Sequence, residues 1–311
     1  MRHMNQGAAS TALVLTDEVR DTIEAGAPVV ALESTIISHG LPTETSATTA
    51  REIEAAVRTT GAVPATVAVV DGAVRVGLTD DQLVEVAEGT DVVKASVRDL
   101  GPALATGRTG ATTVAATSYL AHLAGIGVFA TGGLGGVHRG AAQSWDESAD
   151  LVTLGSVPVT IVCAGVKSIL DVAATLERLE TLSVPLVGYR TDLVPGFYVR
   201  DGGHPVPWRL DGPEEIAAVM RSRRALRLRQ ALVVAQPVGE ADEMDRELHE
   251  RTLQDGLAEI DRRGITGKDV TPFLLGWFHE QTGGASLAAN VSLVLANARL
   301  AAEVAVAFAG K

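Results

Sequence analysis

Short apolar runs alternate along the chain with longer segments in which apolar residues recur every three or four positions. This alternation is typical of α/β proteins, in which buried strands are followed by amphipathic helices. The pattern predicts strands at residues 28–32, 65–70, 73–76, 128–130, 157–163, 185–189 and 231–235, and helices at residues 43–60, 112–123, 168–182, 243–263 and 286–308. The sequence therefore predicts an α/β protein.

Turn residues divide these elements. Asp71-Gly72 predicts a tight hairpin between two strands, and Gly61 is placed to end the helix before it. No repeat and no Pro/Gly/Ser-rich linker divides the chain, so we expect a single domain over residues 1–311, with a disordered tail at residues 1 to about 12. The Pro- and Gly-rich stretch at residues 192–209 is the best candidate for a long functional loop.

Composition and charge exclude several classes of protein. Hydrophobic residues make up 46% of the chain, which is enough for a sizeable core, and the formal net charge of −12 argues against nucleic-acid binding. The single cysteine, Cys163, forms no intramolecular disulfide and fits a reducing cytoplasm. The apolar stretch at residues 286–310 contains Asn290, Asn297, Arg299 and Glu303, so we expect a buried helix of the core or of a subunit interface and no membrane contact.

Lys167 follows an apolar strand and precedes Ser168 and Asp171, which resemble a capping box at a helix start. A helix N-terminus and partial burial both disfavour the ammonium form of a lysine. Only the neutral amine attacks a carbonyl carbon, so Lys167 is a candidate Schiff-base nucleophile. The alternative is a surface lysine near a helix start.

Glu33 stands at the end of the first predicted strand, where α/β sheets place ligand chemistry. Partial burial would raise the pKa of its carboxyl and make it a usable proton donor. The alternative is a carboxylate that accepts hydrogen bonds from the turn at Ser34 and Thr35.

Two further segments carry candidate chemistry. The glycine-rich run from Thr131 to Gly140 lets backbone amides approach a ligand, but its spacing is not a dinucleotide fingerprint, and a tight turn is the alternative. The acidic run at residues 146–150 is suited to a hard cation or to sugar hydroxyls, or is a solvated turn. Lys94 and Arg98, with the helix start at Thr112 and Thr113, are candidate phosphate donors.

Read together, these segments resemble the pseudouridine-5′-phosphate glycosidase family, also called indigoidine synthase A-like. The resemblance covers nearly the whole chain from about Val29, and rests on ALESTIISHG, KASVRDL, TTVAAT, FATGGLGGVHRG, D-x-SADL, VCAGVKSILD, LETLSVPLVGY and TPFLL. It implies an α/β/α sandwich around a central mixed β-sheet, and a homotrimer.

The resemblance also implies roles for individual residues. Glu33 matches the proton donor, and Lys167 matches the lysine that bonds to ribose C1. Asp146 matches the ligand of a Mn²⁺ ion held otherwise by waters. The matching substrate contacts are Lys94, Val114, Ser148, Ala149 and Asp150, with His138 and Asn290 expected in the same pocket.

These roles predict chemistry at C1 of ribose 5-phosphate. A C-glycosidic bond has no leaving-group oxygen to protonate, so two-carboxylate hydrolysis does not cleave it. An iminium between Lys167 and an opened ribose supplies the electron sink, and Glu33 moves protons. The reverse reaction joins ribose 5-phosphate to a nucleophilic carbon of a uracil-like or aromatic acceptor.

Several loops depart from the family pattern. These are Pro42-Thr43-Glu44-Thr45-Ser46, Val194-Pro195-Gly196-Phe197-Tyr198, Asp201-Gly202-Gly203, Gln236 before Pro237, and Glu147. A shifted aglycone is therefore a hypothesis, namely a C-glycosynthase of antibiotic biosynthesis that acts on a prealnumycin-like aromatic polyketide. A pseudouridine-type glycosidase is the other reading. Two alternatives of other classes are a non-catalytic sugar-phosphate binding protein and a Schiff-base aldolase on another sugar phosphate.

Overall fold

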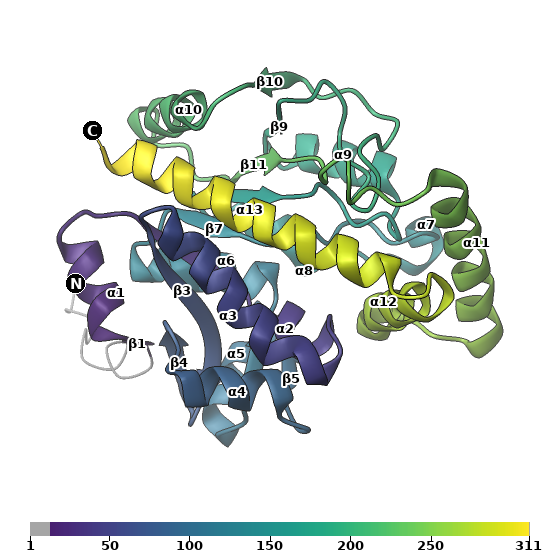
Figure 1. Ribbon diagram of the computed structural model, residues 1–311, viewed down its shortest axis with the longest axis horizontal. Coiled ribbons are helices and arrows are strands. Elements are labelled where there is room, and N and C mark those ends of the chain that lie inside the picture. Colours follow the sequence, from purple (N-terminus) through teal and green to yellow (C-terminus); the bar gives the residue numbers. More distant parts are fainter. Residues whose placement is uncertain (1–12, 311) are drawn as a thin grey trace, which may run out of the picture.

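A large central sheet organises the protein (Figure 1). The structure, a computed structural model, describes residues 13–310, so the predicted tail at residues 1–12 lies outside it. The strands are β1 (Leu13–Leu15), β2 (Val29–Leu32), β3 (Val63–Val70), β4 (Ala73–Val76), β5 (Val93–Ala95), β6 (Gly110–Thr112), β7 (Val128–Ala130), β8 (Thr160–Cys163), β9 (Leu186–Tyr189), β10 (Trp208–Leu210) and β11 (Leu232–Ala235).

The sheet is mixed and mostly parallel. Its main path runs β1-β4-β3-β2-β7-β8-β11-β9-β10, while β6 pairs with both β3 and β5. All neighbours from β3 through β2 to β10 are parallel, and β3 is antiparallel to β4 and β6. The carboxyl ends of β2, β7, β8 and β11 therefore lie at one edge of the sheet.

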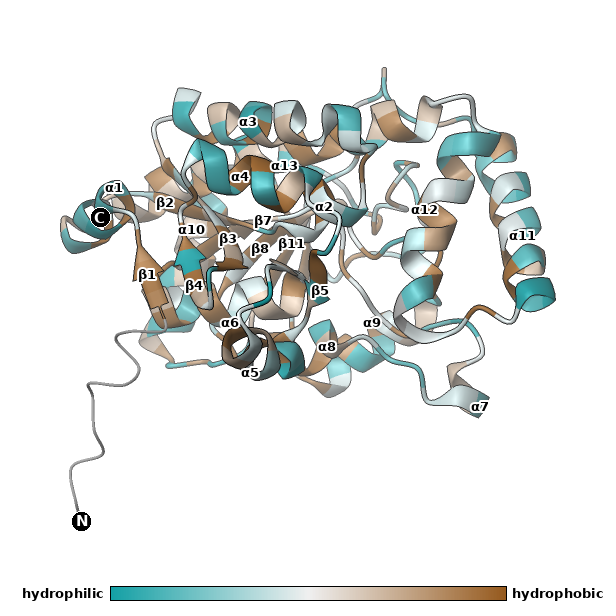
Figure 2. Ribbon diagram, turned by 90° about the horizontal axis from the view of Figure 1, so that it is seen from below, coloured by the Kyte–Doolittle hydropathy of each residue, from teal (hydrophilic) through white to brown (hydrophobic). Residues whose placement is uncertain are grey.

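Helices cover both faces of this sheet, as Figure 2 shows with α3 and α13 on one side and α5, α6 and α8 on the other. The helices are α1 (Asp17–Glu24), α2 (Thr35–His39), α3 (Thr43–Thr59), α4 (Asp80–Glu88), α5 (Val97–Thr106), α6 (Val114–Ala124), α7 (Ala141–Ser144), α8 (Ala149–Leu154), α9 (Val172–Thr181), α10 (Pro213–Ala225), α11 (Arg246–Arg263), the 3-10 turn η1 (Gly267–Asp269), α12 (Val270–Gln281) and α13 (Ala285–Ala309). The predicted sandwich is confirmed.

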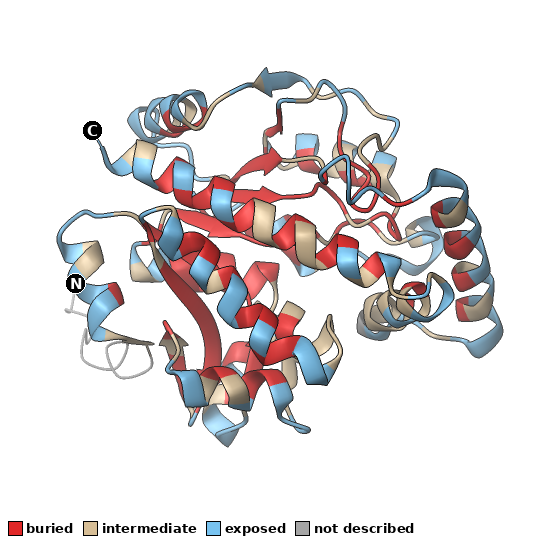
Figure 3. Ribbon diagram, in the orientation of Figure 1, coloured by how far each residue is buried: buried red, intermediate tan, exposed pale blue. Residues whose placement is uncertain are grey.

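Alternate side chains of each central strand point to opposite faces of the sheet and contribute to two hydrophobic cores, one on each face. Val30 and Leu32 of β2 pack with α3 and α13 on one face, whereas Val29 and Ala31 pack on the other. Successive side chains of a strand point to opposite faces, so a strand covered on both sides is apolar throughout. The buried, red strands between partly exposed helices in Figure 3 follow from this requirement.

Most predicted elements are present, but some boundaries were wrong. The helix expected from Thr112 begins at Val114, because Thr112 belongs to β6 and the Thr113 side chain caps the helix. The helix expected from Ser168 begins at Val172, and the strand expected from residue 157 begins at Thr160. The prediction missed helices α1, α2, α4, α5, α7, α8, α10 and α12 and strands β1, β5, β6 and β10.

The turn predictions hold. Asp71 and Gly72 both have positive φ, of 53° and 68°, as the turn of a two-residue hairpin between antiparallel strands requires. Gly61, with φ of 95°, follows the end of α3.

The apolar α13 is long enough to cross a membrane, but its buried residues include Leu293, Ala298 and Ala301, which pack in the core between the sheet, α3 and α10.

Candidate active site

Four of the predicted site residues line one pocket at the carboxyl edge of the sheet. Glu33 directly follows β2, Lys167 follows β8, Lys94 lies in β5 and Asn290 lies on α13. The pocket encloses about 450 Å³ of space, including its mouth. Its other walls are Thr35, Ile36, His39, Gly40, Gly132, Gly133, Phe197, Thr271, Pro272 and Leu275.

The carboxyl group of Glu33 is buried and lies near cationic groups. Burial raises its pKa, and the ammonium of Lys167 and a hydrogen bond from the Thr131 hydroxyl offset this only in part. The alternative that Glu33 accepts from its own turn is wrong, because the Ser34 and Thr35 hydroxyls donate to other strands. A carboxyl in this environment is suited to proton transfer near neutral pH.

Lys167 is partly buried, as expected, but its surroundings differ from those predicted. Helix α9 begins five residues later, and its cap is Asp171, which accepts from the amide of Ala174 at 3.0 Å. The helix therefore begins four residues later than predicted. Lys167 is instead held by its main-chain N–H, which donates to the carbonyl of Leu134 at 3.1 Å.

A buried contact that the sequence did not predict supports the lysine segment. The hydroxyl of Ser168, next to the lysine, lies 2.9 Å from Nε2 of His249 on α11. The His249 ring packs near the rings of Tyr198 and Phe278. Burial lowers the pKa of His249, so the neutral imidazole is favoured. This contact joins residues 81 positions apart and leaves no local signal.

Close packing explains several of the glycines between Thr131 and Gly140. A Cβ on Gly133 would lie 2.7 Å from the ring of Phe197, and one on Gly135 would lie 2.6 Å from Oδ2 of Asp150. A Cβ on Gly136 would collide with Thr175. The glycine run therefore lets the loop approach its neighbours, and Gly132 and Gly133 form one wall of the pocket.

Asp150 is buried behind this loop. Its carboxylate accepts from the amide of Gly135 and from that of Ala115 in the first turn of α6, both at 2.9 Å. Ser148 caps α8, which begins at Ala149. The side chain of Val114 is buried, so a substrate contact at this position would involve its main chain. These residues do not line the pocket, although Asp150 is close enough to influence the pKa of Glu33 and Lys94.

Asp146 and His138 form a separate, partly exposed pair. His138 Nδ1 lies 3.8 Å from Oδ2 of Asp146, and the main-chain amide of His138 donates to the Asp146 carbonyl at 3.0 Å. Burial lowers the pKa of His138, and Asp146 opposes this shift. Within residues 13–310 no three His, Cys, Asp or Glu side chains are grouped to hold a metal ion. A metal bound here would therefore take one carboxylate and complete its shell with water.

Two basic groups of the pocket have lowered pKa values. Burial lowers the pKa of Lys94, and the charge of Lys167 lowers it further. Burial also lowers the pKa of His39, with a second contribution from Lys94. His39 stands in the stretch ISHG but was not predicted as a site residue. Phe197, which lines the pocket from the loop at residues 192–209, supports the functional role expected of that loop.

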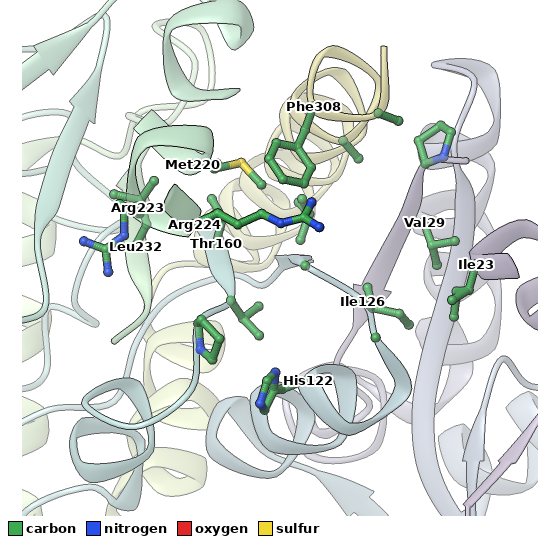
Figure 4. A pocket seen from close by; sticks show the side chains of 18 of the residues that line it. Ile23, Val29, His122, Ile126, Thr160, Met220, Arg223, Arg224, Leu232 and Phe308 are labelled. Atoms are coloured by element: carbon green, nitrogen blue, oxygen red, sulfur yellow. The ribbon is translucent and has the colours of Figure 1, made fainter. Parts of the chain in front are cut away.

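A larger hollow lies at the opposite edge of the sheet (Figure 4). It is bordered by the starts of β2, β7, β8 and β11 and lined by apolar side chains such as Met220 and Phe308, together with Arg223 and Arg224. Its lining contains no carboxylate and no lysine. Ligand chemistry in α/β sheets gathers at the carboxyl ends of strands, so the pocket with Glu33 and Lys167 is the stronger candidate.

The fold and this pairing of a buried carboxyl with a lysine are those of an α/β enzyme. The sequence pattern of the family described as "Indigoidine synthase A like protein" matches residues 18–307. The chain is 58% identical to a pseudouridine-5′-phosphate glycosidase of Salinispora tropica, over 94% of this chain and 91% of the relative. It is 56% identical to one of Streptomyces griseus, over 98% and 95%.

Solved structures agree with these sequence relatives. The prealnumycin C-glycosynthase AlnA, in complex with ribulose 5-phosphate, matches with a TM-score of 0.88 and 39% identity over 99% of this chain and 98% of that one. An indigoidine synthase A-like protein of Thermotoga maritima matches with a TM-score of 0.86 and 36% identity over 98% of both chains. The chain belongs to the indigoidine synthase A-like family, which includes the pseudouridine-5′-phosphate glycosidases.

Proposed function

We propose that this protein is a pseudouridine-5′-phosphate glycosidase. Such an enzyme cleaves the C-glycosidic bond of pseudouridine 5′-phosphate with one water to give ribose 5-phosphate and uracil, and it also catalyses the reverse reaction. One observation carries the proposal: Glu33 and Lys167 come from two strands of the sheet into one pocket. A sugar-phosphate sensor would require neither a buried proton donor nor a nucleophilic amine, so their pairing favours an enzyme.

The chemistry is simplest to follow in the direction of synthesis. The Lys167 amine attacks the C1 aldehyde of open-chain ribose 5-phosphate, and loss of water leaves an iminium. Carbon C5 of uracil then bonds to C1, the electron pair of the C=N bond returns to nitrogen, and C5 loses its proton. Finally O4′ displaces the lysine from C1 and closes the ring. Cleavage is the same sequence reversed, with one water taken up.

Three side chains of the pocket have distinct parts in this sequence. Glu33, which burial holds towards its protonated form, delivers and removes the proton at O4′ as the ring opens and closes. Lys94 lies in the same pocket and supplies a positive charge to the phosphate group. Asn290 lines the pocket from α13 and contacts the substrate.

The remaining site residues act from behind this pocket or beside it. Asp150 and Ser148 hold the glycine-rich loop and α8 in place, and Val114 and Ala149, each the first residue of its helix, would contact the sugar-phosphate through their main chains. A Mn²⁺ ion bound through Asp146 and water, beside His138, would order water and the sugar-phosphate.

The positions of the divergent loops favour the glycosidase over the C-glycosynthase. Glu147 is engaged in a surface ion pair with Arg178 at 2.9 Å, and Gln236 lines a different hollow. Thr43 to Ser46 form the first turn of α3. Of the divergent positions, Phe197 lines the catalytic pocket, and Pro42 and Tyr198 line a hollow that shares His39 and Asn290 with it. The other divergent positions named here lie away from Glu33 and Lys167, and the identity of 58% to a glycosidase against 39% to the C-glycosynthase also favours the glycosidase.

Two further properties are part of the proposal. We expect one domain assembled as a homotrimer in the cytoplasm, with no nucleic-acid or membrane partner. Light scattering of the purified protein measures the subunit number, and a monomer would contradict the expectation.

Turnover of pseudouridine 5′-phosphate with manganese tests the function. Wild type should release ribose 5-phosphate and uracil, whereas Lys167→Ala should show no turnover and no borohydride-trapped adduct with ribose 5-phosphate. Arg108→Ala, which removes an exposed cation outside the pocket, is the control and should behave as wild type. Failure to cleave, with a trapped Lys167 adduct, would reject the glycosidase and retain the lysine chemistry for another acceptor, such as an aromatic polyketide. Turnover by Lys167→Ala equal to that of wild type would reject the lysine mechanism. Cleavage of a carbon–carbon bond within a sugar phosphate, without cleavage of pseudouridine 5′-phosphate, would instead indicate an aldolase.

A further inference from the structure

The segment that carries Lys167 belongs to no helix or strand. It covers residues 164–171, between the end of β8 and the start of α9. Main-chain hydrogen bonds join this segment to the glycine-rich loop. The Lys167 amide donates to the Leu134 carbonyl at 3.1 Å, and the Asp171 amide donates to the Val137 carbonyl at 2.9 Å. These bonds restrain the main chain of the segment from the side of that loop.

Ser168, the residue after the lysine, is held through its carbonyl and its hydroxyl. The carbonyl accepts from Nη2 of Arg139 at 3.3 Å, and the hydroxyl lies 2.9 Å from Nε2 of His249. Ser168 is 7% exposed and His249 is 6% exposed, so water does not replace either partner of this contact at little cost. The contact with His249 therefore restrains the segment from a second side, that of helix α11.

His249 is itself held firmly. Helix α11 lies beside α12 at one end of the molecule (Figure 1). The His249 ring packs near the rings of Tyr198 and Phe278, with centroid distances of 6.3 and 5.5 Å. Close packing restricts rotation of the imidazole, so Nε2 stays within reach of the Ser168 hydroxyl. Neither His249 nor Ser168 lines the catalytic pocket, so any effect of this pair on the reaction passes through Lys167.

The position of the Lys167 amine depends on the main chain that carries it. Its amine ends a flexible four-carbon side chain, which fixes no geometry by itself. A nucleophile must approach the carbon that it attacks at a defined distance and angle, and a misplacement of about 1 Å costs about a hundredfold in rate. A hydrogen bond at the next residue opposes such a displacement.

We infer that His249 is a positioning residue for the reaction: through the Ser168 hydroxyl it holds the Lys167 amine in the geometry that attacks C1 of ribose 5-phosphate. This inference rests on the proposed function, because it requires Lys167 to be the nucleophile. Loss of the contact slows formation of the iminium. It leaves binding of the sugar phosphate unchanged, since the pair does not line the pocket.

The rate of borohydride trapping at increasing ribose 5-phosphate measures iminium formation separately from binding. His249→Phe keeps a ring beside Tyr198 and Phe278 but removes both nitrogens. We expect its maximal trapping rate, and kcat for pseudouridine 5′-phosphate, to fall about tenfold, as for one lost hydrogen bond. The half-saturating concentration of ribose 5-phosphate should stay within about twofold of wild type. His249→Gln places an amide near the position of Nε2 and should restore part of the rate.

Two further variants separate positioning from stability. Ile260→Ala removes a buried side chain from α11 about three turns from His249, so it should lower the urea midpoint but not the trapping rate. Ser168→Ala removes the other partner of the contact, and it replaces His249→Phe in the test if that variant does not fold by circular dichroism. The double variant Ser168→Ala/His249→Phe should be no slower than the slower single variant, because both changes break the same contact.

The outcomes are distinct. Wild-type trapping rates in the folded His249→Phe and Ser168→Ala variants would overturn the inference and leave the glycosidase proposal intact. A raised half-saturating concentration with an unchanged maximal rate would also overturn it, and so would independent, multiplying losses in the double variant.

Failure of the proposed function has a different signature. If wild type traps ribose 5-phosphate but does not cleave pseudouridine 5′-phosphate, the glycosidase is rejected, and the trapping rates of the variants still decide the role of His249. If wild type traps nothing, Lys167 is not the nucleophile and both proposals are rejected.

Discussion

The buried carboxylate of Asp150 joins the glycine-rich loop to helix α6 through two hydrogen bonds. Its replacement by an amide should lower the free energy of unfolding. One oxygen accepts from the amide of Ala115 and the other from that of Gly135, both at 2.9 Å, and the residue is almost fully buried. Asp150→Asn keeps the shape of the side chain. It replaces one accepting oxygen by an NH₂ group that faces a backbone N–H.

The magnitude follows from this geometry. One charge-assisted hydrogen bond is lost, and one buried N–H is left without an acceptor, which together cost about 2–4 kcal/mol. We therefore expect the free energy of unfolding to fall by about that amount. The wall of the catalytic pocket should also become more mobile, because Gly132 and Gly133 of the same loop form it.

Urea unfolding followed by circular dichroism measures this change. Asp146→Asn is the matched control, since Asp146 is partly exposed and accepts no such pair of amides; its unfolding free energy should stay within about 0.5 kcal/mol of wild type. A loss below about 0.5 kcal/mol in Asp150→Asn would refute the reasoning, because the two buried hydrogen bonds would then carry no net stability.

Two further predictions follow from close packing and burial. Gly135→Ala places a methyl group 2.6 Å from Oδ2 of Asp150 and should lower the unfolding free energy by about 1–3 kcal/mol. Gly127→Ala meets no atom within 4 Å and should be near neutral in the same urea titration, so equal losses would contradict the packing argument. The pKa of Glu33 is raised, so its contribution to stability is full below its ordinary pKa of 4.5 and is lost as pH rises through the folded value. The unfolding free energy of wild type should therefore fall relative to Glu33→Gln from acidic to neutral pH, and parallel pH profiles would show that burial does not shift this carboxyl.

Local patterns in the sequence determined which elements form and which residues carry the chemistry. Apolar runs identified β2, β7, β8 and β11, because a strand covered on both faces has no polar side. Helical periodicity identified α3 and α13 within a residue or two of their ends. A polar residue at the end of a buried strand indicated Glu33, and a single lysine after another strand indicated Lys167.

Local patterns failed where a distant contact competes with them. Ser168 and Asp171 have the spacing of a capping box, yet the Ser168 hydroxyl contacts His249 and Asp171 caps α9 alone. The short α12 and the strongly polar α10 carry weak local signals. They form because their apolar sides cover the core, which includes Phe278 and Ile216.

Only the tertiary structure decided what surrounds the reactive groups. Thr131, which donates to Glu33, is 98 positions away in the chain, and Asn297 reaches back 166 positions to the Thr131 carbonyl. The catalytic pocket is assembled from the ends of β2 and β8, from β5 and from α2, α12 and α13, which share no motif. Composition and spacing describe neighbours along the chain, whereas burial and pKa depend on neighbours in space. The sequence by itself therefore indicated the chemistry, and the fold determined its environment.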